Sequence, residues 1–156
     1  MQRLEDILAE AGALRSLSPE HRATLAGCAR LRVFPSGEYL LRAGQPADAF
    51  FVIRHGQVSV LTDVPGRGEV TLETLGDGEL LGWSWLVPPY HTRFGARALD
   101  AAHVVEMDAA CLREKCETDP ALGYDLLRIV ATVFVHRLEE TRVRLLDLYA
   151  LARHAR

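Results

Sequence analysis

The feature that most constrains this chain is the segment from Ala121 to about His154, which contains no proline and only one glycine, Gly123. Its seam residues follow an unbroken 4-3 spacing: Leu127, Ala131, Phe134, Leu138, Thr141, Leu145, Leu148 and Ala152. This heptad pattern predicts one long helix that packs against a parallel partner helix. Thirty helical residues span about 45 Å, which is longer than a small domain can cover. We therefore expect a homodimer formed through residues 121–152.

Short apolar segments separated by turn residues make up the middle of the chain. Residues 70–75 alternate between polar and apolar side chains, which is the period of a half-buried strand. The expected strands are residues 31–34, 39–41, 49–53, 57–61, 70–75, 94–99 and 103–107. About eight short strands at close spacing favour an antiparallel sandwich or jelly roll.

Helical signals flank these strands on both sides. Ser18 followed by Pro19 is a typical helix start, and Asp108 and Asp119-Pro120 predict two more. At 156 residues, the chain has room for one domain with a real core. We expect a single domain over 1–156, with N-terminal helices over 1–30, a β-roll over 31–107 and C-terminal helices over 108–156. The predicted fold class is mainly β with flanking helices: an eight-stranded double-stranded β-helix (jelly roll) followed by a long C-terminal dimerisation helix.

Charge and hydropathy argue against nucleic-acid and membrane roles. The net charge is −3, and the 18 Lys and Arg residues are scattered, whereas nucleic-acid binding needs clustered basic residues. Arg137, Arg142 and Arg144 alternate with Glu139 and Glu140, which favours a solvated face of mixed charge. Neither a signal peptide nor an apolar run of about 18 residues is evident. We expect a cytoplasmic protein that binds neither membrane nor DNA.

The three cysteines, Cys28, Cys111 and Cys116, are odd in number and widely spaced. This spacing argues against a disulfide framework and against an iron–sulfur cluster. We interpret all three as small buried or partly exposed apolar side chains.

The segment from Gly76 to Ala98 has the outline of an anion-binding loop. Gly82 frees the backbone to bend into one short helical turn, where the amides of Trp83, Ser84 and Trp85 suit an anion. The expected ligand-binding residues are Gly82, Trp83, Ser84, Trp85, His91, Thr92, Arg93 and Thr141. Each has a simpler interpretation as well: the tryptophans as packing residues, His91, Thr92 and Arg93 as surface residues, and Thr141 as a polar residue that sets helix register.

Several segments resemble, in order, those of the cyclic-nucleotide-binding domain, and more closely the sensor domain of Crp/Fnr-type regulators. Residues 34–44 (FPSGEYLLRAG) look like its first hairpin, in which glycines recur at similar spacing. Residues 48–58 (DAFFVIRHGQV) resemble its central pattern Asp-x-x-Tyr-x-Ile-x-x-Gly-x-Val. Residues 76–82 (GDGELLG) look like the beginning of its phosphate-binding cassette. The resemblance covers nearly all of residues 10–150 and implies a jelly roll with a nucleotide pocket.

The resemblance also shows where this sequence departs from the family. Trp83 stands where the family has a glutamate for the ribose 2′-hydroxyl, and Thr92 stands where it has the arginine for the cyclic phosphate. Arg93 follows one residue later, and such a shift on a strand reverses the side that a residue faces unless the loop bulges. Thr141 matches the position that presents a threonine to the base. The family's transcription factors continue into a helix-turn-helix, which is not expected here because the sequence ends at Arg156.

Three functions remain open. The first is a stand-alone regulatory module that binds cAMP, cGMP or a related phosphorylated small molecule and signals through its C-terminal helix to a partner protein. The second is a degenerate roll in which Trp83 fills the pocket and the chain acts only as a dimeric interaction subunit. The third is a cupin-like metalloenzyme, but the six histidines include no His-x-His pair. We expect no enzyme activity, no metal and no cofactor beyond a possible nucleotide.

Overall fold

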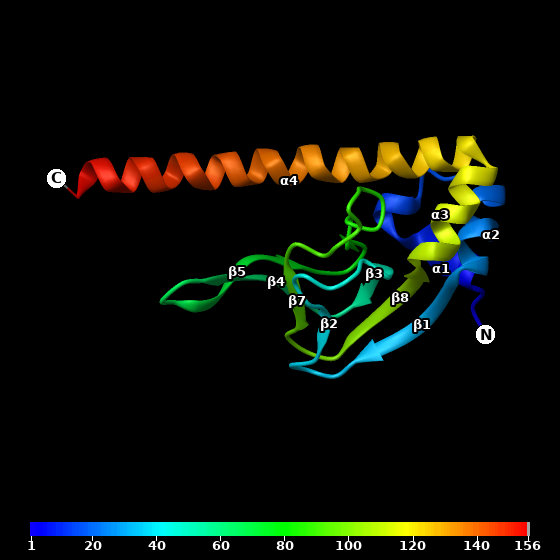
Figure 1. Ribbon diagram of the computed structural model, residues 1–156, viewed down its shortest axis with the longest axis horizontal. Coiled ribbons are helices and arrows are strands. Elements are labelled where there is room, and N and C mark those ends of the chain that lie inside the picture. Colours follow the sequence, from blue (N-terminus) through cyan, green and yellow to red (C-terminus); the bar gives the residue numbers. More distant parts are fainter. Residues whose placement is uncertain (156) are drawn as a thin grey trace.

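The computed structural model describes residues 1–155, in which helices precede and follow a run of strands (Figure 1). The helices are α1 (Leu4–Glu10), the short 3-10 helix η1 (Gly12–Leu14), α2 (Pro19–Gly27), α3 (Ala109–Thr118) and α4 (Pro120–His154). The strands are β1 (Ala29–Phe34), β2 (Tyr39–Leu41), β3 (Ala49–His55), β4 (Val58–Val64), β5 (Gly68–Leu75), β6 (Leu80–Leu81), β7 (Gly95–Ala98) and β8 (Ala102–Asp108). The chain is therefore mainly β with flanking helices, as predicted.

The strands form two four-stranded antiparallel sheets, in the orders β1-β8-β3-β6 and β2-β7-β4-β5. Apolar side chains from both sheets form one buried cluster between them: Phe34, Phe51, Ile53, Val58, Val60, Leu75, Leu81, Ala96, Ala98, Ala102 and Val104. This arrangement is the expected eight-stranded jelly roll, counted over residues 1–155. Strand β6 was not predicted, because two residues are too short to show any alternation.

The helix starts follow the predicted caps. The Ser18 side chain accepts a hydrogen bond from the amide of His21 at 3.2 Å. Asp108 accepts one from the amide of Cys111 at 2.7 Å. Asp119 does the same for Leu122 at 3.4 Å. Each cap satisfies an amide that has no partner within its own helix, and so determines where α2, α3 and α4 begin.

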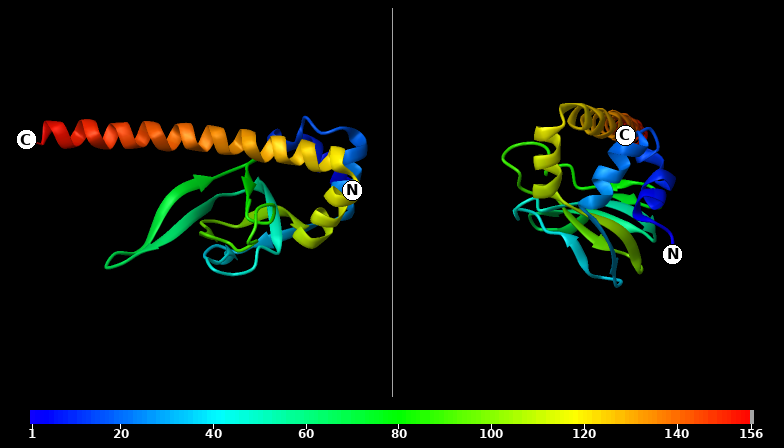
Figure 2. Two further views of the ribbon diagram at one scale, coloured as in Figure 1. Left: turned by 45° about the horizontal axis from the view of Figure 1, so that its top comes forward. Right: turned by 90° about the vertical axis from the view of Figure 1, so that its right-hand side faces the viewer.

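Helix α4 runs 35 residues and extends well beyond the roll, in the same direction as the β4–β5 hairpin (Figures 1 and 2). Its buried residues, Leu122, Leu126, Ile129 and Val130, all lie in the first third of the helix. The distal seam residues Leu138, Leu145 and Leu148 are exposed by 52%, 51% and 64%. The predicted helix is thus present, the distal part of its seam is uncovered, and the homodimer stays a prediction. Among the described helices, none is apolar over a length that could cross a bilayer.

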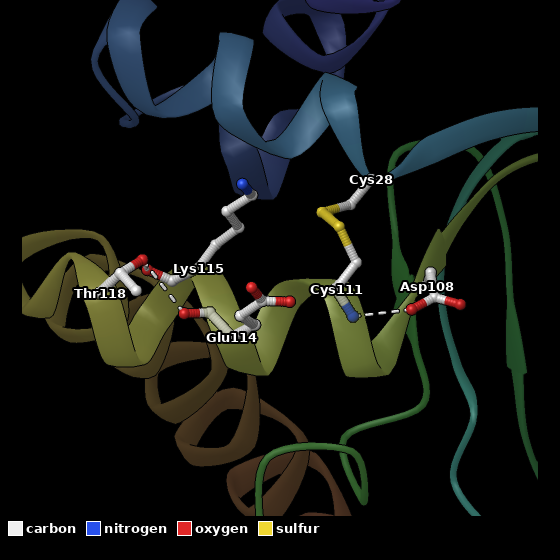
Figure 3. The surroundings of a disulfide bond; sticks show 6 residues. All are labelled: Cys28, Asp108, Cys111, Glu114, Lys115 and Thr118. Atoms are coloured by element: carbon white, nitrogen blue, oxygen red, sulfur yellow. Dashed lines mark hydrogen bonds between the residues drawn. A yellow bond between two sulfur atoms is a disulfide. The ribbon is translucent and has the colours of Figure 1, made fainter.

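A disulfide joins Cys28 to Cys111, so the interpretation of these two cysteines as unpaired is wrong (Figure 3). Cys28 directly precedes β1, and Cys111 lies in the first turn of α3 just after β8. The antiparallel pairing of β1 with β8 places Ala29 opposite Met107 and brings the two Cα atoms to 5.7 Å, although 83 residues separate them in sequence. Sequence spacing could not reveal this contact, because it depends on which strands are neighbours. Cys116 is a free, partly buried thiol, as predicted.

Candidate functional site

A cavity of about 470 Å³ lies between the roll and helix α4. Its walls come from β4, β5 and the start of β7, from the turn that follows β6, and from one face of α4. Six of the predicted ligand-binding residues line it: Gly82, Trp83, Ser84, Thr92, Arg93 and Thr141. The volume falls within the usual range for small-molecule sites in proteins.

Gly82 lets the chain turn sharply into the cavity wall. Its φ of +87° is in the left-handed region that favours glycine, and a Cβ there would lie 3.2 Å from the carbonyl oxygen of Ala49. The chain then makes a single turn, closed by a hydrogen bond of 3.1 Å from the Leu86 amide to the Trp83 carbonyl. Within residues 1–155, no protein group accepts a hydrogen bond from the amides of residues 83–85. This turn therefore presents three consecutive free donors, the arrangement that suits an anion.

Two residues that are buried at the cavity carry hydroxyl groups with unused hydrogen-bonding capacity. The described chain buries three polar side chains, of which Ser59 bonds to Thr71 at 3.0 Å. The other two, Ser84 and Thr92, are 7% exposed, line the cavity and have no protein partner among residues 1–155. Each hydroxyl is therefore free to donate a hydrogen bond to a polar ligand in the cavity and to accept one from it.

The backbone around Thr92 is held in place by the loop after β2. The amide of Thr92 donates to the carbonyl of Gln45 at 2.8 Å, and its carbonyl accepts from the amide of Gly44 at 2.7 Å. The amide of Ala47 donates to the carbonyl of Tyr90, also at 2.8 Å. These bonds position the hydroxyl of Thr92 and the residue after it, Arg93, at the cavity wall.

Arg93 lines the cavity despite its one-residue displacement in the sequence. It lies before β7, which begins at Gly95, so the alternation of faces along a paired strand does not apply to it. The register of the facing pair also shifts between Tyr39 and Leu41. In the described part of the chain, the guanidinium of Arg93 has no carboxylate partner and makes no hydrogen bond to protein.

The two tryptophans occupy different places. Trp83 is half-buried at the cavity and packs edge-to-face on Phe134 of α4, with ring centroids 5.1 Å apart. Trp85 is fully buried in the core against Phe50, and its indole N–H has no hydrogen-bond partner among the described residues. Trp85 therefore matches the packing interpretation, except that its N–H is not tethered.

His91 also lies outside the lining of this cavity. Its side chain is exposed, and its Nδ1 lies 2.9 Å from the carbonyl oxygen of Pro89. The ring thus sits against its own loop, one residue before the buried Thr92. The structure brings together six of the eight predicted residues and leaves Trp85 and His91 apart from them.

Helix α4 contributes two arginines that sequence analysis assigned to a solvated face. Arg137 donates to the carbonyl of Leu80 at 2.5 Å, and its other terminal nitrogen is 3.8 Å from the carboxylate of Glu73. Arg144 donates to the carbonyl of Leu72 at 3.0 Å. The solvated interpretation is wrong for Arg137, which is partly buried, but Arg142 and Arg144 are both exposed as predicted. Arg137 and Arg144 line the cavity, and Arg142 does not.

A sequence signal for these arginines was available. Arg137, Thr141 and Arg144 follow the same 4-3 spacing as the seam and therefore share one face of the helix. The hydroxyl of Thr141 donates to the carbonyl of Arg137 at 2.8 Å. Its oxygen can still accept a hydrogen bond from a ligand in the cavity.

A larger cavity, of about 720 Å³, lies at the opposite side of sheet β1-β8-β3-β6, against α1 and η1. Its lining mixes acidic and basic side chains and includes the pair His55 and Asp77, whose Nδ1 and Oδ2 atoms are 3.1 Å apart. No group of three His, Cys, Asp or Glu side chains within residues 1–155 is arranged to hold a metal ion. The predicted residues gather only at the smaller cavity, which is the candidate site.

This chain is similar in sequence and in structure to known proteins. The profile of the family described as cyclic nucleotide-binding domain matches residues 31–119, which is more than half of the chain. The chain belongs to the cyclic nucleotide-binding domain family. The matched segment runs from β1 through β8 and α3, and so includes the turn at Gly82 and the residues around Arg93.

Three relatives illustrate the similarity. A CRP-like cAMP-activated global transcriptional regulator of Mycobacterium tuberculosis is 28% identical over 145 residues, which cover 93% of this chain and 63% of the relative. The chain thus spans less than two thirds of that regulator. A cyclic nucleotide-binding protein from Geobacter metallireducens has a TM-score of 0.79 at 28% identity and covers 88% of this chain and 99% of its own. A cyclic nucleotide-binding domain from Methylobacillus flagellatus has a TM-score of 0.78 at 21% identity, with coverages of 93% and 82%, and so supports the fold alone.

Proposed function

We propose that this chain is a regulatory module that binds cAMP, cGMP or a related phosphorylated small molecule in the 470 Å³ cavity. The observation that carries the proposal is the group of unused donors on the wall formed by the turn after β6 and the residues before β7. The side chains of Ser84, Thr92 and Arg93 have no protein partner among residues 1–155, and the amides of residues 83–85 are free. Family membership supports a nucleotide as the ligand.

The chemistry of a phosphate group fits this wall. A phosphate oxygen accepts hydrogen bonds readily from backbone amides and hydroxyls, and a guanidinium can donate two parallel bonds to it. Arg93 supplies the guanidinium, and Ser84 and Thr92 supply hydroxyl groups at the cavity wall. On the other side, the Trp83 ring and Phe134 offer an apolar surface for a base. Because the cavity is open beside Trp83, it does not support the alternative in which Trp83 fills the pocket.

Helix α4 is the element through which binding would be transmitted. Arg137 and Arg144 reach from α4 to the carbonyls of Leu80 and Leu72 in the roll, and both line the cavity. A ligand that bonds to these guanidiniums would compete with or reinforce these contacts and so change how α4 sits on the roll. The exposed seam of α4 would pass this change to a second copy of the chain or to a partner protein. The proposed role is regulatory and not catalytic.

Calorimetric titration of the purified protein with cAMP and with cGMP tests the proposal. We expect saturable heat with at least one of them, with one ligand bound per chain. Circular dichroism of the same sample establishes that the protein is folded. A flat titration with both ligands overturns the cyclic-nucleotide form of the proposal.

A further inference from the structure

The charges that line the cavity are unequal. Three guanidiniums, those of Arg93, Arg137 and Arg144, face a single carboxylate, that of Glu73, which leaves a charge of +2 on the lining that the structure describes. Hydrogen bonds from Arg137 and Arg144 to the carbonyls of Leu80 and Leu72 orient these side chains but neutralise no charge. A ligand that brings two negative charges would balance this site.

The arginines also keep most of their hydrogen-bonding capacity. A guanidinium has five N–H donors, and the contacts of Arg137 and Arg144 with protein use only some of them. Arg93 uses none within residues 1–155. Since the three side chains come from two separate elements, the loop before β7 and helix α4, they can approach one anionic group from different sides. A group with three terminal oxygens could accept hydrogen bonds from several guanidiniums on one lining.

The rest of the lining is largely apolar. Trp83 packs edge-to-face on Phe134 at 5.1 Å between ring centroids, and Leu138 follows Phe134 one turn later on α4. This wall can receive a flat ring, and Thr141 adds a hydroxyl on the same helix face. The lining thus combines a site for an aromatic body with one for a strongly charged group.

We infer, resting on the function proposed above, that the preferred ligand is a dianionic phosphomonoester with an aromatic base, such as a nucleoside 5′-monophosphate. A phosphomonoester carries a charge of about −1.5 to −2 at pH 7, with a second pKa near 6. A cyclic phosphodiester carries a single charge and has only two free oxygens. The monoester therefore matches both the +2 charge of the lining and the donors of its three arginines.

Competing titrations separate the two ligand classes. We would titrate the protein with 5′-AMP, 5′-GMP, cAMP and cGMP at pH 7.5 and at pH 5.0. At pH 7.5 we expect at least one monophosphate to bind at least about tenfold more tightly than its cyclic counterpart, as one additional charged hydrogen bond implies. At pH 5.0 the preference for the monophosphate over its cyclic counterpart should fall, because the monoester takes up a proton and becomes a monoanion.

The pH dependence reports on the ligand because the cavity lining, as described, contains no histidine. The charged side chains that face the ligand are Glu73, Arg93, Arg137 and Arg144. His91 and His136, each adjacent in sequence to a lining residue, lie outside the lining. In the variants His91→Gln and His136→Gln, the preference for the monophosphate should therefore still fall at pH 5.0. If it does not fall in either variant, protonation of the ligand is not the cause of the pH dependence.

A matched pair of variants tests the arginines directly. Arg144→Gln removes a charge from the cavity lining, whereas Arg142→Gln removes one from outside the lining, two residues away on the same helix. We expect Arg144→Gln to weaken monophosphate binding at least about tenfold and to reduce the preference over the cyclic form, while Arg142→Gln changes neither. Equal or tighter binding of the cyclic nucleotides overturns the inference and leaves the proposed function intact. If folded protein binds none of the four nucleotides, both fail.

Discussion

Arg93 directly follows Thr92 and lines the cavity with Thr92 and Ser84, and no carboxylate in the described chain neutralises its charge. Because a charge-assisted bond to phosphate contributes about 1.5–3 kcal/mol, Arg93→Ala should weaken nucleotide binding at least tenfold by this estimate. Arg67→Ala, which removes an exposed arginine from the β4–β5 turn, is the matched control. If Arg93→Ala binds nucleotide with unchanged affinity, the phosphate is bound by the backbone amides and the arginines of α4 instead of Arg93.

Glu106 on β8 links the stability of the roll to pH. Its carboxylate bonds to Arg30 and Arg32 on β1, each at 2.8 Å. Burial raises the pKa of Glu106, but hydrogen bonds and charges from Arg32 and Arg30 outweigh it, so its pKa lies below the ordinary 4.5. A carboxyl with a lowered pKa stabilises the fold above its unfolded pKa, and this stabilisation is lost as pH falls through the folded value.

The variant Glu106→Gln should therefore be less stable than the wild type at pH 7, by about 0.5–1 kcal/mol for a partly exposed ion pair. The difference should shrink as pH falls below 4.5, where the wild-type carboxyl also becomes neutral. Urea unfolding at several pH values measures the difference in unfolding free energy between the wild type and this variant. A difference that does not depend on pH would mean that the effect comes from packing and not from charge.

At the residue scale, the sequence predicted the donors on the roll and Thr141 on the helix, but not the two arginines of the helix. Ser84, Thr92 and Arg93 are close to Gly82 in sequence, so a loop motif could group them. Arg137 and Arg144 are more than forty residues away, and their role depends on how α4 lies against β5. Trp85 shows the reverse case, because its place near Gly82 in sequence did not bring it to the cavity.

The disulfide between α2 and α3 is the element-scale feature that the sequence concealed. It closes a loop of 83 residues between the N-terminal helices and the C-terminal ones. Loss of a native disulfide typically costs about 2–4 kcal/mol. We therefore expect Cys111→Ser to lower the thermal unfolding midpoint, while Cys116→Ser, at the free thiol, leaves it nearly unchanged.

Reductant should lower the midpoint of the wild type towards that of Cys111→Ser. Intact-mass analysis after alkylation checks the pairing itself. Three alkylated cysteines in protein purified without reductant would contradict the disulfide. Burial, and then the charge of Asp119, raise the pKa of the Cys116 thiol, so alkylation of this residue should be slow at neutral pH.

The exposed seam of α4 predicts that two copies of the chain pack together as a dimer. Leu145 lies on the seam and is 51% exposed, and Val143 lies off the seam and is 58% exposed. If a second copy covers the seam, Leu145→Glu should convert a dimer to a monomer, because it buries an unpaired charge in the contact. Val143→Glu adds the same charge at a similar exposure and should leave the dimer intact. Light scattering after size-exclusion chromatography measures both, and a monomeric wild type contradicts the dimer.

At the scale of the whole molecule, the order of helices, strands and helices followed from turn residues, caps and periodicity along the sequence. These signals are local, which is why Ser18, Asp108 and Asp119 predicted three helix starts correctly. The sequence did not reveal contacts between distant segments: the disulfide, the pairing of β6 with β3 and the approach of α4 to the roll. The candidate site lies where α4 approaches the roll, so the prediction covered its roll side and Thr141 but missed Arg137 and Arg144.

A crystal structure of the protein with a bound nucleotide would test the proposed binding mode. We expect the phosphate to lie within hydrogen-bonding distance of Arg93 and of at least one of the hydroxyls of Ser84 and Thr92. We also expect the base to lie beside Trp83 on the α4 side of the cavity. A nucleotide bound elsewhere, or an empty cavity in crystals grown with saturating nucleotide, would contradict this binding mode.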